Sequence, residues 1–238
     1  MPSFLPRSFQ PELIDGEEFT NEELVTSYHE IEWVNRFLGG TRTLTSHLFP
    51  LLSGKNPPLQ LADVGCGSAD IPLQVLQWSR KMGIPVRLIL VDRNFHILRI
   101  VKERFAGFAG VLVAQADANR LPFKPGSIHI LTASLLLHHF PTAQAVQLLR
   151  HFQEISREAI LINDLIRGWI PYLSISLLST LFSRSRLVRN DAPLSVRRGF
   201  SPGEVRALAV AAGATRWKFS RHFPYRFCLL IEFEESRK

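Results

Sequence analysis

Cysteines and long apolar runs are both scarce in this chain of 238 residues. It has two cysteines, which excludes a scaffold held together by several disulfides. The longest apolar segment, residues 169–182, contains a proline and is shorter than the ~20 residues that a membrane-spanning helix needs. The first residues lack the continuous apolar core of a signal peptide. We therefore expect a protein without a transmembrane helix that stays in the reducing cytoplasm.

Positive charge exceeds negative charge, with 28 Lys and Arg against 21 Asp and Glu and a net charge of +7. Hydrophobic residues make up 46% and charged residues 21%, close to ordinary globular proteins, so global disorder is excluded. The basic excess has two interpretations. It is either a solvated surface or a sign of an anionic partner, such as nucleic acid, a phospholipid surface or an acidic substrate.

Short apolar runs alternate with amphipathic runs over most of the chain. Apolar runs without internal alternation are typical of strands buried on both faces, and the amphipathic runs are typical of helices that cover such a sheet. The predicted strands are 59–64, 86–91, 111–114, 128–133, 159–162, 214–219 and 226–233. The predicted helices among them are 70–82, 95–105, 143–156 and 202–213. The pattern predicts an α/β fold with a mostly parallel sheet.

An N-terminal helical segment precedes this repeat. Residues 1–18 are expected to form a loose leader. Apolar residues at helical spacing predict a helix over residues 21–38, which ends at Gly39-Gly40. A second helix over 41–52 and a loop over 54–58 follow. The predicted units are a helical cap over 1–54, a sheet domain over 55–238 and an insertion in that domain over 165–200.

A glycine-rich turn joins the first predicted strand to the helix after it. It reads Asp63-Val64-Gly65-Cys66-Gly67-Ser68-Ala69-Asp70. Glycines permit a tight turn and let a ligand approach the backbone, and the start of the next helix offers free N–H groups. Because the turn lies at the carboxyl edge of a predicted parallel sheet, we expect a cofactor site there.

Two common nucleotide-binding turns do not fit this segment. The fingerprint G-x-G-x-x-G would place its third glycine at Asp70, where a carboxylate would repel a pyrophosphate. No Gly-Lys-Ser/Thr follows, which excludes a P-loop. The turn instead resembles motif I of class I S-adenosylmethionine-dependent methyltransferases, in which an acidic residue ends the strand before G-x-G. That family usually has a third glycine where this chain has Ala69, a departure that we expect to be mild because alanine is nearly as small.

Three later segments resemble the same family in the expected order. Asp92 ends the second strand, where the family uses an acidic residue to accept both ribose hydroxyls. Asp117 and Ala118 look like the family's adenine-binding turn, and residues 127–140 resemble the strand-four motif of its small-molecule members. The resemblance implies that S-adenosylmethionine is the cofactor, that S-adenosylhomocysteine is its product, and that it contacts Asp63, Gly65, Cys66, Gly67, Asp70, Asp92, Arg93, Asp117, Ala118 and Ser134.

The resemblance also implies a fold. We expect the Rossmann-like class I methyltransferase architecture, with a seven-stranded, mostly parallel sheet and one antiparallel strand. The N-terminal helices and a helical lid formed by residues 165–200 would be added to this core.

Signatures of macromolecular acceptors are missing. Residues 133–136 read Ala-Ser-Leu-Leu, where amino-methylating DNA and RNA enzymes have a D/N-P-P-aromatic tetrad. Neither Cys66, expected in the turn, nor Cys228, expected in the core, is placed as the nucleophile of a cytosine-5 enzyme. The paired glutamates of protein arginine methyltransferases are absent, and Asp164 with Asn163 is too small a set for magnesium, so no metal is predicted. We expect a small-molecule acceptor and no nucleic-acid partner.

Transfer from an activated methyl donor requires alignment, exclusion of water and a base for the acceptor's proton. His138 and His139 follow the fourth predicted strand, and histidine ordinarily titrates near neutral pH. Asp164, at the end of the fifth strand, is a third candidate, as a base or a substrate anchor. We predict His139 first as the catalytic base. A purely structural role for the histidines is the alternative, because a histidine that ends a buried strand is often structural.

The insertion is apolar in its first half and basic in its second, where Arg184, Arg186, Arg189, Arg197 and Arg198 occur. It is predicted to be either a helix packed on the core followed by a solvated loop, or a hydrophobic acceptor pocket with a basic rim that contacts a membrane peripherally. The pattern loosely resembles bacterial polyketide and quinone methyltransferases. That resemblance favours O-methylation of a hydroxylated aromatic, polyketide or quinone-like acceptor, with C-methylation of a quinone precursor as the alternative.

Two rival functions stay open on the sequence alone. One is a non-catalytic protein of the same fold that binds RNA or a membrane surface through the basic insertion, for which salt-dependent nucleic-acid binding would be the sign. The other is an RNA methyltransferase of an unfamiliar type. The sequence leaves the identity of the acceptor and the oligomeric state undetermined.

Overall fold

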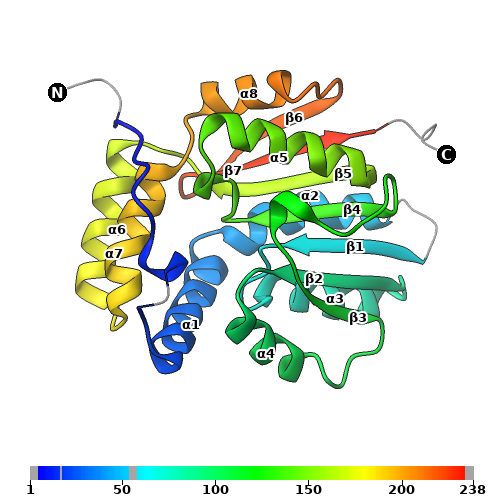
Figure 1. Cartoon of the computed structure of the whole chain (residues 1–238), viewed down its shortest axis with the longest axis horizontal. Helices are drawn as coiled ribbons and strands as arrows, with labels where there is room; N and C mark the ends of the chain where they lie inside the picture. The colour runs from blue at the N-terminus through cyan, green and yellow to red at the C-terminus, as the bar shows by residue number, and fades with distance from the viewer. Residues whose placement is uncertain (1–4, 17, 54–57, 234–238) are drawn as a thin grey trace.

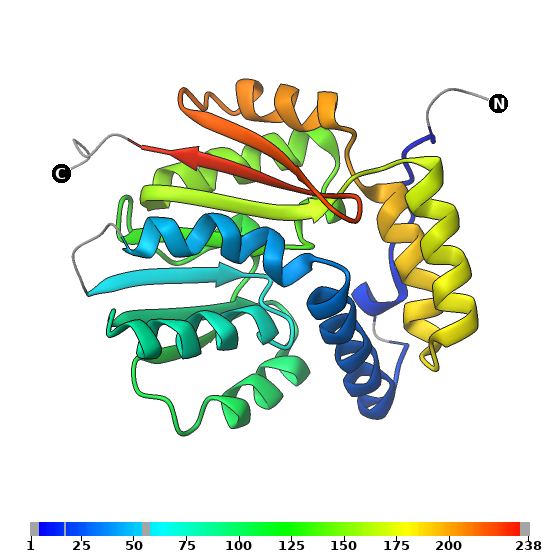
Figure 2. The same cartoon turned by 180° about the vertical axis from the view of Figure 1, so that it is seen from behind.

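The computed structural model describes residues 5–16, 18–53 and 58–233 (Figures 1 and 2). The predicted boundary between residues 54 and 55, and most of the predicted loop there, lie outside the described residues. In the part of the chain that the structure describes, no helix is long and apolar enough to cross a membrane.

A single seven-stranded sheet has the strand order β3-β2-β1-β4-β5-β7-β6 (Figure 1). Its strands are β1 (Leu59–Val64), β2 (Val86–Asp92), β3 (Val111–Gln115), β4 (Ile128–Ser134), β5 (Ser156–Leu165), β6 (Trp217–His222) and β7 (Arg226–Glu232). The β7 strand pairs antiparallel with both β5 and β6, and the other neighbouring pairs are parallel. The predicted fold, a mostly parallel sheet with one antiparallel strand, is therefore confirmed.

Helices cover both faces of the sheet. On one face lie α2 (Gly40–Ser53), α3 (Asp70–Met82) and α4 (Phe95–Arg104), whose buried side chains form one hydrophobic cluster with the sheet. On the other face, α5 (Thr142–Ile155) and α8 (Pro202–Ala211) form a second cluster. These two cores explain why the central strands carry continuous apolar runs, since β1, β4, β5 and β7 are buried on both sides.

Three further helices lie beyond the carboxyl ends of the parallel strands (Figure 1). They are α1 (Asn21–Phe37), α6 (Trp169–Phe182) and α7 (Arg186–Arg198). A capping box at Thr20 begins α1, and the Ser185 hydroxyl accepts the N–H of Val188 to begin α7. In an open α/β sheet this edge is where ligands bind, so these helices enclose the region in which a site is expected.

The expectation of a loose leader is wrong for residues 5–16. The Ser8 N–H donates to the Arg197 carbonyl over 3.0 Å, and the N–H groups of Leu13 and Ile14 donate to the Asp191 carboxylate over 2.8 and 2.9 Å. A short 3₁₀ turn, Leu13–Asp15, follows from this anchoring. Contacts with α7, which is distant in sequence, hold this segment in place. Its own sequence therefore shows no helical or strand periodicity from which the order could be predicted.

Two predicted element boundaries were also wrong. The β5 strand begins at Ser156 and runs to Leu165, well beyond the predicted 159–162, because β4 and β7 pair with it on both sides. The β6 strand begins three residues later than predicted, since the Ala214 N–H still bonds the Ala209 carbonyl at the end of α8.

The basic half of the insertion forms the helix α7, so the predicted solvated loop is wrong. Its arginines do not form a common basic rim. Arg198 is buried, while Arg186 pairs with Glu23 over 3.1 Å, and Arg189 donates to the Ser183 carbonyl. These three arginines are therefore engaged in contacts within the molecule, so part of the excess of positive charge needs no anionic partner.

Candidate active site

A cavity of about 2110 Å³ opens at the carboxyl edge of the sheet. Pockets for a single drug-sized ligand measure roughly 300–1,000 Å³, so this cavity has room for a cofactor and an acceptor together. Asp164 is the one predicted site residue that does not line it. The predicted residues that do are Asp63, Gly65, Cys66, Gly67, Asp70, Asp92, Arg93, Asp117, Ala118, Ser134, His138 and His139.

The glycine turn needs its two glycines for both conformation and space. Gly65 and Gly67 have φ of +69° and +51°, a left-handed region that favours glycine. A Cβ at Gly65 would lie 2.9 Å from Leu136 Cδ1, and one at Gly67 would lie 2.9 Å from Tyr28 Cε1. Ala69 also has a positive φ, +57°. The cost of alanine there is thus conformational, roughly 1 kcal/mol, and the expectation based on its small size overlooked this strain.

Asp92 ties the glycine turn to the end of β2. Its Oδ2 accepts the Gly67 N–H and its Oδ1 accepts the Asn94 N–H, both over 2.9 Å. Burial raises the pKa of Asp92 above its ordinary value, although these hydrogen bonds oppose the shift. Each carboxylate oxygen can accept more than one hydrogen bond, so Asp92 retains acceptor capacity toward the cavity.

The neighbouring turn presents a second acidic group and an open backbone. Asp117 accepts the Asn119 N–H over 2.8 Å and starts the 3₁₀ turn Ala118–Arg120. On the far side of the glycine turn, the Ser134 hydroxyl accepts from Asn163 Nδ2 over 3.2 Å. Three strand ends therefore present polar groups to one cavity, as the parallel topology predicts.

Arg226, at the start of β7, is a cavity residue that the sequence analysis missed. It is almost completely buried, and it donates to the Leu38 carbonyl and to Asn35 Oδ1. Its Nη1 has no hydrogen-bond partner within the described residues. The Asn35 amide in turn donates toward Asp70 over 3.4 Å. A fixed guanidinium with an unused donor suits a carboxylate ligand.

The charges of the cavity fit S-adenosylmethionine, which carries a sulfonium, an ammonium, a carboxylate and a ribose diol. Asp63 and Asp70 offer carboxyl groups for the cations, Arg226 offers its unused donor for the carboxylate, and Asp92 offers acceptors for the diol. The glycine turn leaves the backbone bare beside them. The residues present therefore fit this cofactor on chemistry as well as on volume.

Ligand binding at this site is expected to release protons. Burial raises the pKa of Asp63 to about 7 and that of Asp70 to about 6, and Glu32 adds to the shift of Asp70. In the unliganded fold both groups therefore oppose stability increasingly as pH rises from about 4 to about 7, because the unfolded chain releases these protons first. A bound cation favours the ionised carboxylates. Between pH 5 and 7, we expect the affinity for S-adenosylmethionine to rise about tenfold for each unit by which binding lowers the pKa of these carboxyl groups.

Calorimetric titration in two buffers with different ionisation enthalpies measures this proton release directly. Asp70→Asn should reduce the number of protons released, whereas Glu154→Gln, at an exposed position on α5, should not. An affinity for S-adenosylmethionine that stays constant from pH 5 to 8 would contradict the prediction.

His138 is held between two buried carboxylates. Its Nδ1 lies 2.7 Å from Asp164 Oδ1, and its Nε2 lies 3.3 Å from Glu12 Oε1. Asp164 Oδ2 also accepts the backbone N–H of His138 over 3.0 Å. Burial alone would lower the pKa of His138, but the two carboxylates raise it to about 10. This imidazole is therefore protonated at neutral pH, and Asp164 lies behind it rather than at the cavity surface.

His139 is oriented by a different carboxylate. Its Nδ1 lies 2.9 Å from Asp15 Oδ2, which places a proton on that nitrogen. Its Nε2 lies 3.8 Å from Glu12 Oε2, beyond hydrogen-bond distance. Arg93 pairs with the same aspartate over 2.7 Å. The His139 ring lines the cavity, with Asp15 orienting its Nδ1 and with its Nε2 toward Glu12. A ring oriented by a carboxylate in this way is a candidate base.

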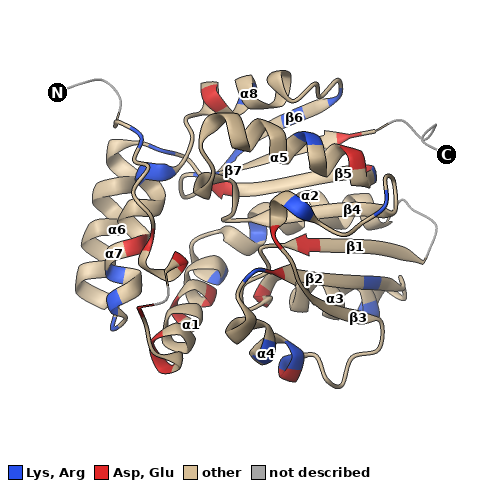
Figure 3. Cartoon of the chain, in the orientation of Figure 1, with Lys and Arg blue, Asp and Glu red and all other residues tan. Residues whose placement is uncertain are grey.

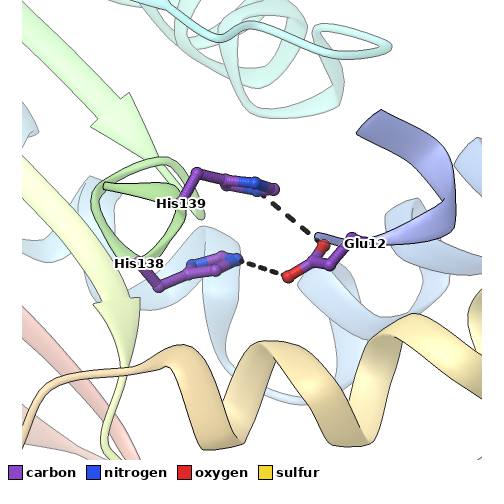
Figure 4. A group of neighbouring side chains, drawn as sticks. All are labelled: Glu12, His138 and His139. Atoms are coloured by element: carbon purple, nitrogen blue, oxygen red, sulfur yellow. Dashed lines mark ion pairs between the residues drawn. The ribbon is translucent and has the colours of Figure 1, made fainter. Parts of the chain in front are cut away.

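Glu12 brings the two imidazoles together (Figure 4). One ligand atom from each of Glu12, His138 and His139 lies within 4.8 Å of the others, a spacing that could hold a metal. However, Arg198 Nε lies 3.8 Å from Glu12 Oε1, and its Nη1 lies 3.6 Å from Asp15 Oδ2. This guanidinium and the protonated His138 already balance the carboxylates, so we interpret the group as an ion-pair cluster.

Three residues of this cluster and the cofactor wall were not singled out from the sequence: Glu12, Asp15 and Arg226. The first two belong to the segment expected to be loose, and Arg226 was given no role. Arg198 was named only as one of the arginines of a basic rim or a solvated loop. The local signal available was Glu12 and Asp15 themselves, the two acidic residues of a proline-containing stretch that has no periodicity.

Comparison with known proteins agrees with this geometry. Residues 61–158 match a family model described as a methyltransferase domain. An uncharacterised chloroplastic methyltransferase of Arabidopsis thaliana is 32% identical over 88 residues, which are 34% of this chain and 24% of that protein. The match therefore spans about a quarter of the relative's length.

Two solved structures share the fold at low sequence identity. Human N-acetylserotonin methyltransferase in complex with S-adenosylmethionine has a TM-score of 0.65 and 14% identity, covering 90% of this chain and 56% of that one. The plantazolicin methyltransferase BpumL, in complex with S-adenosylhomocysteine, has a TM-score of 0.65 and 16% identity, covering 90% of both chains. Residues 61–158 therefore carry a methyltransferase domain, and the chain has the fold of S-adenosylmethionine-dependent methyltransferases, as its sequence predicted.

Proposed function

We propose that this protein transfers the methyl group of S-adenosylmethionine to an oxygen of a small, hydrophobic, hydroxylated acceptor of aromatic, polyketide or quinone type. The observation that carries the proposal is the pairing of His139 with Asp15 on the wall of the cavity that also contains the glycine turn. A base and a methyl-donor site then face one enclosed volume. A base beside the donor also serves C-methylation of an acidic carbon, the alternative, which the experiment below distinguishes by the atom that is methylated.

Most of the cofactor's contacts in this proposal follow the sequence prediction: Asp92 accepts the ribose hydroxyls, and Asp117 and the Ala118 N–H meet the adenine. Arg226, which the sequence prediction did not include, binds the carboxylate. The cofactor supplies a methyl group already activated by a sulfonium, so the protein's task is to align the acceptor and remove its proton. The remaining predicted contacts, which include Gly65 to Gly67, form the wall of the cofactor site.

His139 takes the acceptor's proton at Nε2. Its Nδ1–H is fixed by Asp15, so Nε2 is the ring nitrogen left to take the proton. His138 cannot share this role because it is already protonated between Asp164 and Glu12. We assign His138 and Asp164 a positioning role, in which they hold the 3₁₀ turn Leu137–His139 and thereby the neighbouring ring.

The acceptor's apolar character is inferred from the wall opposite the glycine turn. α6 and α7 contribute Ile175, Leu178, Phe182, Leu187 and Val188 to the cavity. Apolar walls with few polar groups are typical of sites for small hydrophobic molecules. The helical cap and the insertion close over this side and exclude water, which favours a charged nucleophile reacting with a sulfonium.

The cytoplasm remains the expected compartment, and both cysteines are free and buried.

Incubation with methyl-labelled S-adenosylmethionine tests the proposal. The acceptors are a long-chain resorcinol, a hydroxynaphthoquinone, an aromatic amine and total cellular RNA, each analysed by mass spectrometry. We expect O-methylated product from the hydroxylated compounds. Methyl groups found on a ring carbon, or in RNA in preference to the phenols, would contradict the proposal.

A further inference from the structure

Exposed apolar side chains gather at the mouth of the cavity. We call Trp33, Leu178, Phe182, Phe223 and Tyr225 the apolar rim, since all of them line the cavity and are also exposed. Phe223 and Phe182 have 91% and 76% of their surface exposed. They come from α1, α6 and the turn between β6 and β7, which lie on the same side of the molecule in Figure 2.

A second apolar surface adjoins the rim on the same helix. Ile170, Leu173, Leu177 and Leu181 follow helical spacing and form the outer face of α6, with each side chain at least 60% exposed. The helix carries no charged residue, as its uniform tan colour in Figure 3 shows. Contiguous exposed apolar surface of this kind on a water-soluble fold marks a contact site.

Arginines flank this surface on three elements. Arg36 precedes the exposed Phe37 on α1, Arg184 follows Phe182 by two residues, and Arg221 precedes Phe223 by two. All three arginines are exposed. A protein surface that docks onto an anionic bilayer combines two features. Its apolar side chains insert into the bilayer, and neighbouring cationic side chains bind the lipid phosphates.

We propose that the apolar rim and the outer face of α6 dock onto an anionic lipid bilayer, and that the acceptor enters the cavity directly from it. α6 has 14 residues, too few to span a bilayer, so it would lie in the interface. A cavity that opens within this surface receives an acceptor with a long apolar chain without passing it through water. The acceptor class rests on the proposed function, whereas docking does not.

Vesicle sedimentation of the full chain tests docking without any methyl transfer. The vesicles are phosphatidylcholine alone, and phosphatidylcholine with phosphatidylglycerol at a ratio of about 3:1. We expect binding to the anionic vesicles that weakens at high salt. The combined variant Leu173→Ser, Leu177→Ser and Leu181→Ser should lower partitioning at least about tenfold. A matched control changes three exposed apolar residues elsewhere: Met82→Ser, Leu112→Ser and Val210→Ser.

Calorimetric titration with S-adenosylmethionine shows that each variant is folded, because none of the changed residues lines the cavity. Equal vesicle binding by the α6 variant and the control variant would overturn the proposal, as would no binding to either vesicle. A dimer in light scattering that only the α6 variant loses would also overturn it, since a second copy would then cover the face. Methyl transfer to a water-soluble phenol, measured in parallel, shows whether the proposed function survives a negative docking result.

Discussion

Asp92→Ala should weaken S-adenosylmethionine binding by roughly 100-fold to 10,000-fold. Two charge-assisted hydrogen bonds to ribose hydroxyls contribute about 1.5–3 kcal/mol each, and every 1.4 kcal/mol is a factor of about ten. The same carboxylate also accepts the Gly67 N–H, so its loss loosens the glycine turn and leaves a buried donor unpaired. Calorimetric titration of the wild type and the variant with S-adenosylmethionine and S-adenosylhomocysteine measures the effect.

Two companion variants separate binding from folding. Asp92→Asn keeps the size of the side chain and one oxygen acceptor, so it should weaken binding less than alanine does. Glu154→Ala removes an exposed carboxylate far from the cavity and should change nothing. If a folded Asp92→Ala protein bound the cofactor within about threefold of wild type, the assignment of Asp92 to the ribose would be wrong.

His139→Gln should lower kcat by about 10²–10⁴-fold, the usual contribution of a general base. Cofactor affinity should be nearly unchanged, since the glycine turn and Asp92 are intact. Asp15→Asn should have a smaller effect, because the ring keeps its lone pair and loses only its oriented partner. Rates of O-methyl product formation at saturating cofactor provide the comparison.

The exposed His29→Gln on α1 is the matched control for His139→Gln and should retain full activity. His138→Gln is expected to behave differently from both, by lowering thermal stability, because it leaves Asp164 buried without its ion-pair partner and removes one of the cationic partners of Glu12. A His139→Gln enzyme with wild-type kcat would exclude this residue as the base and return the choice to the other groups of the cavity.

The cofactor half of the site could be predicted because its signals are local. Asp92 and Ser134 each end a strand, and Asp63 is the next-to-last residue of one; the apolar run of each strand is plain in the sequence. Parallel topology then brings those strand ends to one edge, so proximity in space follows from the order of elements alone. The glycine turn adds a conformational requirement that few residues satisfy, which made it recognisable without knowledge of its neighbours.

The acceptor half could not be predicted in the same way. Glu12 and Asp15 lie in a segment without periodicity, and contacts with α7, the turn before α5 and Arg93 after β2 fix them. In the sequence, Arg198 is one of several basic residues of the insertion. In the structure, it is buried against these carboxylates. Such pairings depend on contacts across most of the chain, for which the periodicity of a single sequence gives no information.

The pairing of His139 with Asp15 joins residues 124 positions apart, whereas the cofactor wall from Asp63 to Ser134 is one continuous stretch of sequence, closed by Arg226. Contacts of high sequence separation cost more chain entropy to close and depend on the rest of the fold. A chain whose first residues are undocked would still have an intact donor wall but no oriented base. Turnover therefore reports whether the N-terminal segment is docked, while donor binding reports the state of the sheet.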